Sequence, residues 1–260
     1  MAGEGSPVLI RVEEKTATGV ITLNRPPLNI LDIGTLRALG DALEEMVGAS
    51  GCSFVVIEAA GEKAFCAGAD VGDHLPEKAP AMLEAFHRVA RYLHAMDAVS
   101  IAAVRGVALG AGFELALCCD LVLASESASF GQPEINLGCF PPIAVAILPE
   151  RIGRHLAAEV VLTGRRFSAA EARSMGLVTR TVPQDGFDKA LEGLLAELQS
   201  KSRSALRIAT RALRRAAPKD FDAAIAAAER AYVEELLPLE DAREGITAFM
   251  EKRKPEWGHR

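Results

Sequence analysis

Two hydrophobic periods alternate along the first two thirds of the chain. Short runs of nearly consecutive apolar residues, typical of strands buried on both faces, occur at 53–61, 100–106 and 120–126. Between them, apolar residues recur every three or four positions, as on one face of a helix, at 35–50 and 81–98. Alternation of strand and helix patterns predicts an α/β fold with parallel strands.

The two ends of the chain depart from this alternation. Residues 8–24 are rich in β-branched side chains and predict two strands joined by a turn at Ala17–Gly19. From about Ala157 onward the pattern is mainly helical, with one short strand expected near 176–183.

Prolines divide the C-terminal part into several helices. Pro218 and Pro238 interrupt the helical pattern of the last sixty residues, because proline ends or kinks a helix at the residue before it. We therefore predict an α/β core over residues 1–200 and a helical C-terminal region over residues 201–260.

Composition narrows the class of protein. A chain of 260 residues that is 50% hydrophobic and 25% charged can bury the core of one large globular domain. The net charge of −6 gives no domain-wide basic field, so nucleic acid is not expected as a partner. Five cysteines without a CxxC pair fit neither a disulfide framework nor a zinc site. With no secretory signal and no apolar stretch of membrane-spanning length, we expect a cytoplasmic protein without a metal site or a membrane association.

Two glycine-containing loops are candidates for ligand binding. "FCAGAD" (Phe65–Asp70) and "ALGAGFE" (Ala108–Glu114) each follow a buried strand and lead towards a helix. The first N–H groups of a helix have no intrahelical partner and carry the positive end of the helix dipole. If the two loops converge, they supply a pair of N–H donors suited to an oxyanion. For either loop alone, the alternative is glycine serving a turn that requires a positive φ.

Two carboxylates occur in apolar surroundings, where burial is costly unless they are hydrogen-bonded or do chemistry. Glu114 lies near the start of its helix, and Glu134 follows Pro133 in a loop. Glu114 could instead satisfy free N–H groups at that helix start, which is worth about 0.5–2 kcal/mol, and Glu134 could pair with a nearby arginine. Beside two oxyanion donors, the pair would act as acid and base on a substrate carbonyl and its neighbouring carbons.

Five segments together resemble the enoyl-CoA hydratase/isomerase, or crotonase, superfamily over Val8 to Trp257. The segments are "ITLNRPPLNILD", "KAFCAGADV", "IAAVRGVALGAGFELALCCDLVLASESASFGQPEINLG", "LTGRRFSAAEARSMGLV" and "REGITAFMEKRKPEW". The resemblance implies a crotonase-like spiral of ββα units with a helical C-terminal trimerisation region, assembled as a homotrimer or homohexamer. The implied ligand is an acyl-CoA thioester substrate, with no cofactor, because coenzyme A is part of the substrate.

The resemblance also implies the roles of four residues. The backbone N–H groups of Ala69 and Ala111 would bind the thioester oxygen and stabilise an enolate. Glu114 would orient and deprotonate water, and Glu134 would deliver a proton to the enolate carbon. Isomerases of the superfamily generally keep only the glutamate that matches Glu134, so the presence of both favours hydration or its reverse, with isomerisation as the nearest alternative.

The coenzyme A moiety is expected against the two loops and the C-terminal segment. Phe249 and Lys252 belong to the basic segment "FMEKRK", whose alternative explanation is a solvated basic helix end. The implied substrate-binding residues are Leu28, Ala67, Gly68, Asp70, Gly110, Phe140, Phe249 and Lys252.

Two departures from the common pattern bear on the acyl group. The chain has "LGCFPPIAVAILPERIG" where many members are glycine-rich, and "PPLNILDI" near residue 28. Both resemble the alicyclic dienoyl-CoA hydratases. A wall of Phe140, Ile143 and Val145 would shape the pocket for a ring, unless these residues only pack a helix. Straight-chain or branched enoyl-CoA thioesters are the alternative substrates.

One alternative belongs to another functional class. The superfamily includes an RNA-binding member, so a binding or scaffolding homologue with little turnover is possible in principle. The basic run Arg211–Arg215 would then be the contact surface. The intact glutamate pair and the acidic net charge argue against this alternative.

Overall fold

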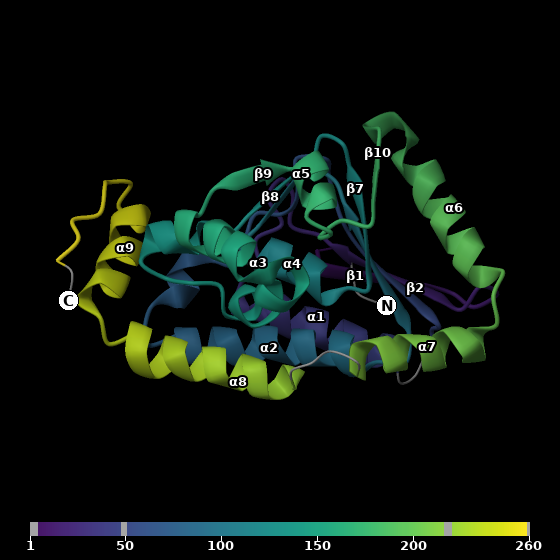
Figure 1. The fold of residues 1–260 in the computed structure, drawn as a ribbon, viewed down its shortest axis with the longest axis horizontal. Helices are drawn as coiled ribbons and strands as arrows, with labels where there is room; N and C mark the ends of the chain where they lie inside the picture. Colours follow the sequence, from purple (N-terminus) through teal and green to yellow (C-terminus); the bar gives the residue numbers. More distant parts are fainter. Residues whose placement is uncertain (1–4, 48–50, 216–219, 259–260) are drawn as a thin grey trace.

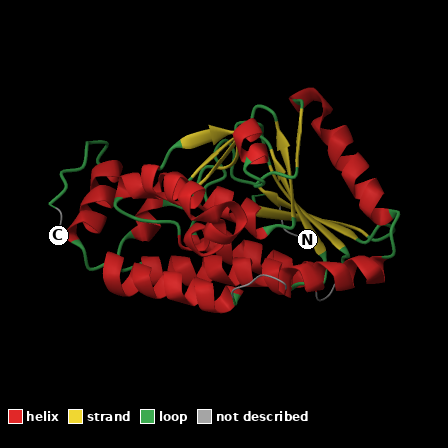
Figure 2. Ribbon diagram, viewed as in Figure 1, coloured by secondary structure: helices red, strands yellow, loops and turns green. Residues whose placement is uncertain are grey.

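The computed structural model describes residues 5–47, 51–215 and 220–258, and these contain two sheets (Figures 1 and 2). The six-stranded sheet has the order β1 (Val8–Glu13), β2 (Thr18–Leu23), β3 (Phe54–Ala59), β5 (Val99–Val104), β7 (Leu121–Ser125) and β10 (Arg180–Val182). The four-stranded sheet has the order β4 (Ala64–Cys66), β6 (Val107–Leu109), β8 (Ser129–Gly131) and β9 (Arg166–Ser168). Neighbouring strands are parallel except for the antiparallel pairs β1–β2 and β8–β9.

Helices connect and cover these sheets. The longer ones are α1 (Ile33–Val47), α2 (Ala79–Ala95), α3 (Ala111–Cys118), α4 (Pro142–Thr163), α5 (Ala169–Ser174), α6 (Phe187–Gln199), α7 (Arg203–Arg215), α8 (Phe221–Arg230) and α9 (Glu240–Met250). Short 3₁₀ segments are η1 (Val71–His74), η2 (Pro133–Leu137) and η3 (Gln184–Gly186), and η4 (Ala231–Leu236) is π-helical.

The same unit of two strands and a helix recurs three times along the chain. The units are β3–β4–α2, β5–β6–α3 and β7–β8–α4. In each unit the first strand joins the six-stranded sheet and the second joins the four-stranded sheet. This arrangement confirms the predicted α/β spiral of ββα units, and in the second unit it places the end of β6 at Leu109 directly before the start of α3 at Ala111.

The large sheet is buried on both faces because its strands alternate between two hydrophobic clusters. Val20, Val56 and Ile101 point towards α6, where they pack with Phe187 and Leu194. Their sequence neighbours belong to the main core with α1, α2 and α3; these are Ile21, Val55, Ile57 and Ala102. A strand buried on both sides reads as a continuous apolar run, which explains why the sequence pattern located these strands.

Two local predictions need correction. The turn predicted at Ala17–Gly19 lies earlier, because Gly19 is already in β2 opposite Val12. A Cβ on Gly19 would collide with the sulfur of Met46, so this glycine permits close packing of α1 on the strand rather than a turn. The glycine-containing stretch near 107–109 and residues 166–168 form short strands that the pattern did not predict, since three residues carry too little periodicity.

The C-terminal helices pack against the core rather than forming a separate body. Figure 1 shows α8 running alongside α2, and α8 also packs on α4. The last helix, α9, contacts η1, which follows the first glycine loop, and η2, which carries Glu134. Pro218 lies outside the described residues, and the boundary between residues 200 and 201 stays a prediction. In the described part of the chain, no helix combines the length and apolarity needed to cross a bilayer.

Candidate active site

A cavity of about 590 Å³ opens where the two glycine loops, η2 and α9 meet. Its walls include seven of the residues predicted from the sequence: Leu28, Ala67, Gly68, Ala69, Gly110, Glu134 and Phe249. These residues come from positions as far apart as 28 and 249, so the fold brings the predicted site together.

The first loop is held by the backbone of the segment that precedes α1. Ala67 donates its N–H to the carbonyl of Leu28 at 2.9 Å, and Asp70 donates to Leu31 at 3.1 Å. Leu31 in turn donates to the carbonyl of Gly68 at 3.0 Å. The Ala69 N–H lies between these bonds and donates to no described residue. The loop therefore leaves one backbone donor free at the cavity wall.

The second loop leaves a matching donor at the start of α3. Gly110 precedes the helix with φ of 51°, a conformation that glycine adopts without strain. Its carbonyl accepts the N–H of Glu114 at 2.9 Å, which closes the first helical turn. The N–H of Ala111 has no acceptor among the described residues, as expected for a first helical residue.

Glycines allow the two loops to touch. A Cβ on Gly112 would collide with the backbone of Cys66, and a Cβ on Gly110 would lie 3.7 Å from the Cα of Gly68. The backbone approach leaves no room for larger residues. The free N–H groups of Ala69 and Ala111 consequently lie on adjoining loops, and the positive end of the α3 dipole adds to the attraction for an anion.

Glu134 lies at the inner wall of the cavity, in the first turn of η2. It is 8% exposed, and its buried Oε2 makes no hydrogen bond with any described residue. A side chain on Gly110 would collide with Oε1, so the glycine makes room for this carboxyl group. Burial, and then the negative charge of Glu114, raise the pKa of Glu134 well above its ordinary value. The pairing with an arginine considered from the sequence does not occur within the described residues.

Glu114 is more deeply buried, at 2% exposed. Its Oε1 accepts the backbone N–H of Ala144 at 2.9 Å, so it binds the first turn of α4 rather than capping its own helix. Burial raises the pKa of Glu114 to about 7, against the opposing effect of this hydrogen bond. The helix-cap explanation considered from the sequence is therefore wrong.

Several predicted residues lie outside the cavity wall. The Asp70 carboxylate instead accepts the N–H of Gly72 at 2.9 Å and caps η1. Lys252 follows α9 with φ of 57° and is exposed. Ala111 and Glu114, both buried, are not among the residues that line the cavity.

The proposed ring-shaping wall also needs correction. Phe140 packs edge-on against the ring of Tyr232, with centroids 5.3 Å apart. Ile143 is fully buried in the core, and Val145 is 38% exposed on the outer side of α4. None of the three lines the cavity.

The cavity contains groups that the sequence pattern did not single out. Lys63 and Arg166 line it, and neither side chain forms an ion pair within the described part of the chain. Arg253 also lines it and pairs with Glu244, with Nη2 and Oε2 2.8 Å apart. His74 is buried there with Nδ1 3.0 Å from the carbonyl of Asp70, and burial lowers its pKa. A basic residue directly before "AFCAGAD" was the available signal for Lys63.

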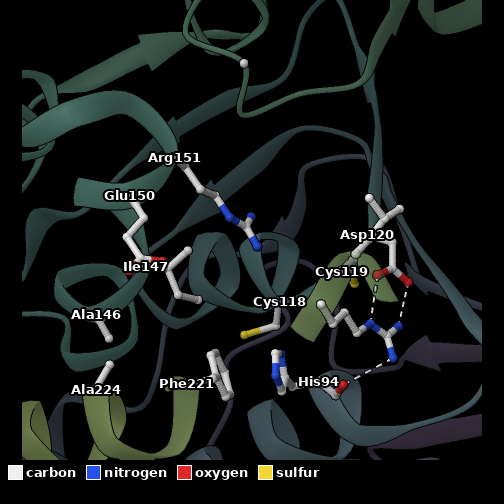
Figure 3. Close-up of a pocket in the computed structure, with 13 residues that line it drawn as sticks. His94, Cys118, Cys119, Asp120, Ala146, Ile147, Glu150, Arg151, Phe221 and Ala224 are labelled. Carbon is white, nitrogen blue, oxygen red and sulfur yellow. Dashed lines mark hydrogen bonds and ion pairs between the residues drawn. The ribbon is translucent and has the colours of Figure 1, made fainter. Parts of the chain in front are cut away.

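A second cavity of about 500 Å³ lies at the other end of α3 (Figure 3). Cys118 and Cys119 line it, and burial raises the pKa of the Cys118 thiol to about 12, so this thiol stays un-ionised. Asp120 is engaged by Arg214 through bonds of 2.9 and 2.6 Å. This cavity contains none of the predicted site residues.

The basic run at Arg211–Arg215 has a structural role. Arg214 also donates to the carbonyls of His94 and Ala98, at 3.3 and 3.0 Å. Arg211 pairs with Asp97, with Nε and Oδ1 3.0 Å apart. Two arginines of the run thus fasten α7 to the core. Among the described residues, no group of three or more His, Cys, Asp or Glu side chains is arranged to hold a metal ion.

Comparison with known proteins extends these observations. The sequence profile of the "Enoyl-CoA hydratase/isomerase" family matches residues 13–260. The chain is 40% identical to the putative enoyl-CoA hydratase/isomerase YngF of Bacillus subtilis (strain 168), over 96% of this chain and 97% of that protein. It is 34% identical to the cyclohexa-1,5-dienecarbonyl-CoA hydratase of Thauera aromatica, over the full length of both chains.

Comparison with solved structures also finds similarity to enoyl-CoA hydratases. The fold matches the crystal structure of an enoyl-CoA hydratase from Mycobacterium avium subsp. paratuberculosis K-10 with a TM-score of 0.86 and 30% identity, over 97% of this chain and 98% of that one. Since the family profile spans nearly the whole sequence and the relatives cover it from end to end, the chain belongs to the enoyl-CoA hydratase/isomerase family.

Proposed function

We propose that the protein is a hydro-lyase that adds water to, or removes it from, the conjugated C=C bond of an acyl-CoA thioester. The observation that carries the proposal is the pair of buried carboxyl groups, Glu114 and Glu134, beside two loops that each keep a free backbone N–H. Many relatives bear the name enoyl-CoA hydratase, which supports the same class of reaction.

The oxyanion donors act on the thioester. The carbonyl oxygen accepts the N–H groups of Ala69 and Ala111, and both bonds strengthen as the oxygen gains negative charge in the enolate. Loss of one such donor typically costs about 2.7–4 kcal/mol of transition-state stabilisation. Because these donors are fixed by backbone bonds, they need no reorganisation when the charge develops.

The two glutamates divide the proton transfers. The Glu114 carboxylate removes a proton from water as the water oxygen bonds to the β carbon and the C=C electrons move towards the thioester oxygen. Glu134 then gives its proton to a carbon of the enolate, which restores the thioester carbonyl. The assignment follows from the pKa values, since burial raises the pKa of Glu114 to about 7, whereas burial and then the charge of Glu114 raise the pKa of Glu134 well above its ordinary value.

The coenzyme A moiety is held at the rim of the same cavity. Lys63, Arg166 and Arg253 supply positive charge for its phosphates, and Leu28 and Phe249 supply apolar surface. The enzyme uses no separate cofactor in this proposal. Assembly as a homotrimer or homohexamer and a cytoplasmic location remain predictions from the sequence and its resemblance.

For the acyl group we propose a cyclic dienoyl-CoA of aromatic or alicyclic acid degradation. Support comes from the sequence features at Pro141–Pro142 and near Leu28, and from the full-length match to the Thauera aromatica hydratase. Straight-chain substrates are the principal alternative, since other relatives are named crotonyl-CoA and short-chain-enoyl-CoA hydratases.

One assay tests both the proposed reaction, hydration, and the proposed acyl group. Hydration of crotonyl-CoA, cyclohex-1-ene-carbonyl-CoA and cyclohexa-1,5-diene-1-carbonyl-CoA is followed spectrophotometrically under identical conditions. We expect the highest kcat/KM with the cyclic diene. Preference for crotonyl-CoA would reject the ring substrate but keep the hydratase, whereas no hydration of any of the three would reject the hydratase.

A further inference from the structure

His74 is the second buried polar side chain in the lining of the active-site cavity. The polar side chains of this lining are those of Lys63, His74, Glu134, Asn136, Arg166 and Arg253. Only His74 and Glu134 of this set are buried, each at 8% exposed, whereas the other four are exposed. The cavity therefore has an outer rim with three positive charges and a buried inner part with two titratable groups.

One ring nitrogen of His74 is committed to the backbone. Nδ1 lies 3.0 Å from the carbonyl oxygen of Asp70, the N-cap of the same short helix η1. The carbonyl of Val71 acts on the ring in the same sense, and both carbonyls belong to the turn that precedes His74. A carbonyl oxygen only accepts hydrogen bonds, so Nδ1 carries a proton and donates it. Burial lowers the pKa of His74, which favours the neutral ring. In a neutral imidazole protonated at Nδ1, Nε2 keeps a free lone pair and is an acceptor.

Nε2 of His74 can be reached from the cavity. It forms no hydrogen bond with any described residue and, unlike Nε2 of His87, it is not enclosed by protein atoms. The carboxylates of Asp70 and Asp73, whose charges act on the ring, bind other partners. A ligand in the cavity thus meets an acceptor that the protein itself leaves unused.

The course of the chain places His74 on the acyl side of the thioester. The chain passes from Lys63 through β4 and the first glycine loop into η1. Residues 67–70 keep the extended course of β4, since they pair in parallel with residues 28–31. In the function proposed above, Lys63 binds a phosphate and Ala69 binds the thioester oxygen. The acyl group then continues towards His74 and the buried part of the cavity.

The surroundings of Nε2 select the kind of donor that it can meet. The negative charges of Asp73 and Asp70 act on the ring, and Glu134 lines the same cavity, so an acyl group that ends in a carboxylate is disfavoured. Burial disfavours an ammonium group, because it would have to give up its hydration. A hydroxyl group donates a hydrogen bond without carrying a charge, and it therefore fits this acceptor best.

We propose that Nε2 of His74 accepts a hydrogen bond from a hydroxyl substituent of the acyl group, beyond the reacting C=C bond, and that His74 is thereby a specificity-determining residue. The inference rests on the hydratase function proposed above. It narrows the substrate to hydroxy-substituted acyl-CoA thioesters, whether the acyl group is a ring or a chain. An analogue without the hydroxyl binds more weakly, because Nε2 loses water and gains no donor in exchange.

Binding of saturated acyl-CoA thioesters tests this contact without turnover. Each hydroxyacyl-CoA is paired with an analogue of the same length in which a methyl group replaces the hydroxyl. The pairs are 4-hydroxybutyryl-CoA with pentanoyl-CoA, 5-hydroxypentanoyl-CoA with hexanoyl-CoA, and 6-hydroxyhexanoyl-CoA with heptanoyl-CoA. Isothermal titration calorimetry gives the ratio of the two Kd values for each pair.

Two variants separate the backbone contact of His74 from the contact with the ligand. The amide of His74→Asn replaces Nδ1 at the Asp70 carbonyl and has no atom at the position of Nε2. The amide of His74→Gln reaches the position of Nε2, and its oxygen supplies an acceptor there. His155→Asn is the matched control, because His155 is exposed on α4 and does not line the cavity.

In the wild type we expect the hydroxyl member of at least one pair to bind about tenfold more tightly, the usual effect of one hydrogen bond to a buried group. His74→Asn should bring this ratio to within about twofold of unity. His74→Gln should restore part of the ratio, and His155→Asn should keep the wild-type value. No preference in any wild-type pair, or a preference that His74→Asn retains, would overturn the inference.

A crystal structure of the wild-type protein with the preferred hydroxyacyl-CoA does not depend on the folding of any variant. The hydroxyl oxygen should lie about 3 Å from Nε2 of His74, and a hydroxyl bonded elsewhere would contradict the proposal. A protein that hydrates no enoyl-CoA yet shows the preference that depends on His74 would reject the hydratase function and keep the contact. Hydration without such a preference would reject the contact alone.

Discussion

Glu114 and Glu134 are the same residue type in the same buried site, and their surroundings make them different acids. Glu114 accepts a backbone N–H from the first turn of α4 at 2.9 Å, whereas the Oε2 of Glu134 meets no donor from the described residues. Desolvation raises both pKa values. Two backbone N–H groups of α4, those of Ala144 and Ile143, favour the charged form of Glu114, whereas Glu134 has only its own backbone N–H and is opposed by the charge of Glu114.

The comparison shows how one fold produces a base and an acid from two glutamates. Two carboxyl groups that interact closely cannot both ionise easily, so the additional backbone hydrogen bonds that Glu114 receives from α4 favour Glu134 as the group that keeps the proton. The direction of proton flow in the proposed reaction then follows from the position of α4, an element separate from both loops.

The largest expected effect comes from removing either carboxyl group. Glu114→Gln and Glu134→Gln should each lower kcat for hydration by about 10²- to 10⁴-fold, the usual contribution of general acid–base catalysis. They should differ in α-proton exchange with butyryl-CoA in deuterated buffer, which Glu134→Gln abolishes and Glu114→Gln retains. If Glu114→Gln kept double-bond isomerisation as its main reaction at wild-type rate, an isomerase rather than a hydratase would be indicated.

Gly110→Ala tests the space that Glu134 occupies. The new Cβ would collide with Oε1 of Glu134, at a position whose φ of 51° already disfavours alanine. Displacement of the carboxyl by about 1 Å should lower kcat/KM about 100-fold. Gly193→Ala on α6, where the added Cβ meets nothing, is the matched control and should leave kcat/KM unchanged. Equal activities of the two variants would contradict the assigned role of Gly110.

The pH profile of kcat/KM should have two limbs, a rising one due to Glu114 and a falling one due to Glu134. Hydration requires ionised Glu114 and protonated Glu134, so kcat/KM should rise with pH through about 7, where Glu114 loses its proton. It should fall again at higher pH as Glu134 ionises. Each limb should change the rate about tenfold per pH unit. A wild-type profile that falls as pH increases through 7 would reverse the assignment of base and acid.

The smallest effect concerns stability. The folded-state pKa of Glu114 is about 7 and its ordinary value is 4.5, so the folded protein binds more protons than the unfolded chain between these values. The contribution of Glu114 to the free energy of unfolding is fully present below about pH 4.5. As pH rises towards 7, the free energy of unfolding decreases by an amount on the order of 2–3 kcal/mol. Urea unfolding measures the free energy of unfolding at about pH 5 and about pH 8. Between these pH values it should decrease less for Glu114→Gln than for the wild type. Equal decreases in the two proteins would contradict the raised pKa of Glu114.

The predictability of the fold varied with the length of the element. Strands such as β3 and β5 were evident because burial on both faces leaves an unbroken apolar run. The three-residue strands β6 and β9 were missed, since pairing with distant partners creates them and no local period marks them. Gly19 was misassigned for a related reason: its requirement is a contact with Met46, a residue 27 positions away.

The site was predicted unevenly. The loops and both glutamates were recognisable because their chemistry depends on residue types at fixed spacing, and seven predicted residues line the cavity. Lys252, Asp70 and Phe140 were chosen by their place in a motif, and the structure directs them elsewhere. The direction in which a side chain points depends on the packing of its whole element, which a motif does not contain.

By itself, the sequence determined the α/β alternation, the two glycine loops and the presence of two carboxyl groups in apolar surroundings. These depend on local periodicity and on residue chemistry, both of which are present in a single chain. The tertiary structure decided that the loops converge, that α4 supplies the amide for Glu114, and that Phe249 of the last helix lines the same cavity as Leu28. Such contacts join residues far apart in sequence, so they exist only after the ββα units have stacked and the last helices have closed over them.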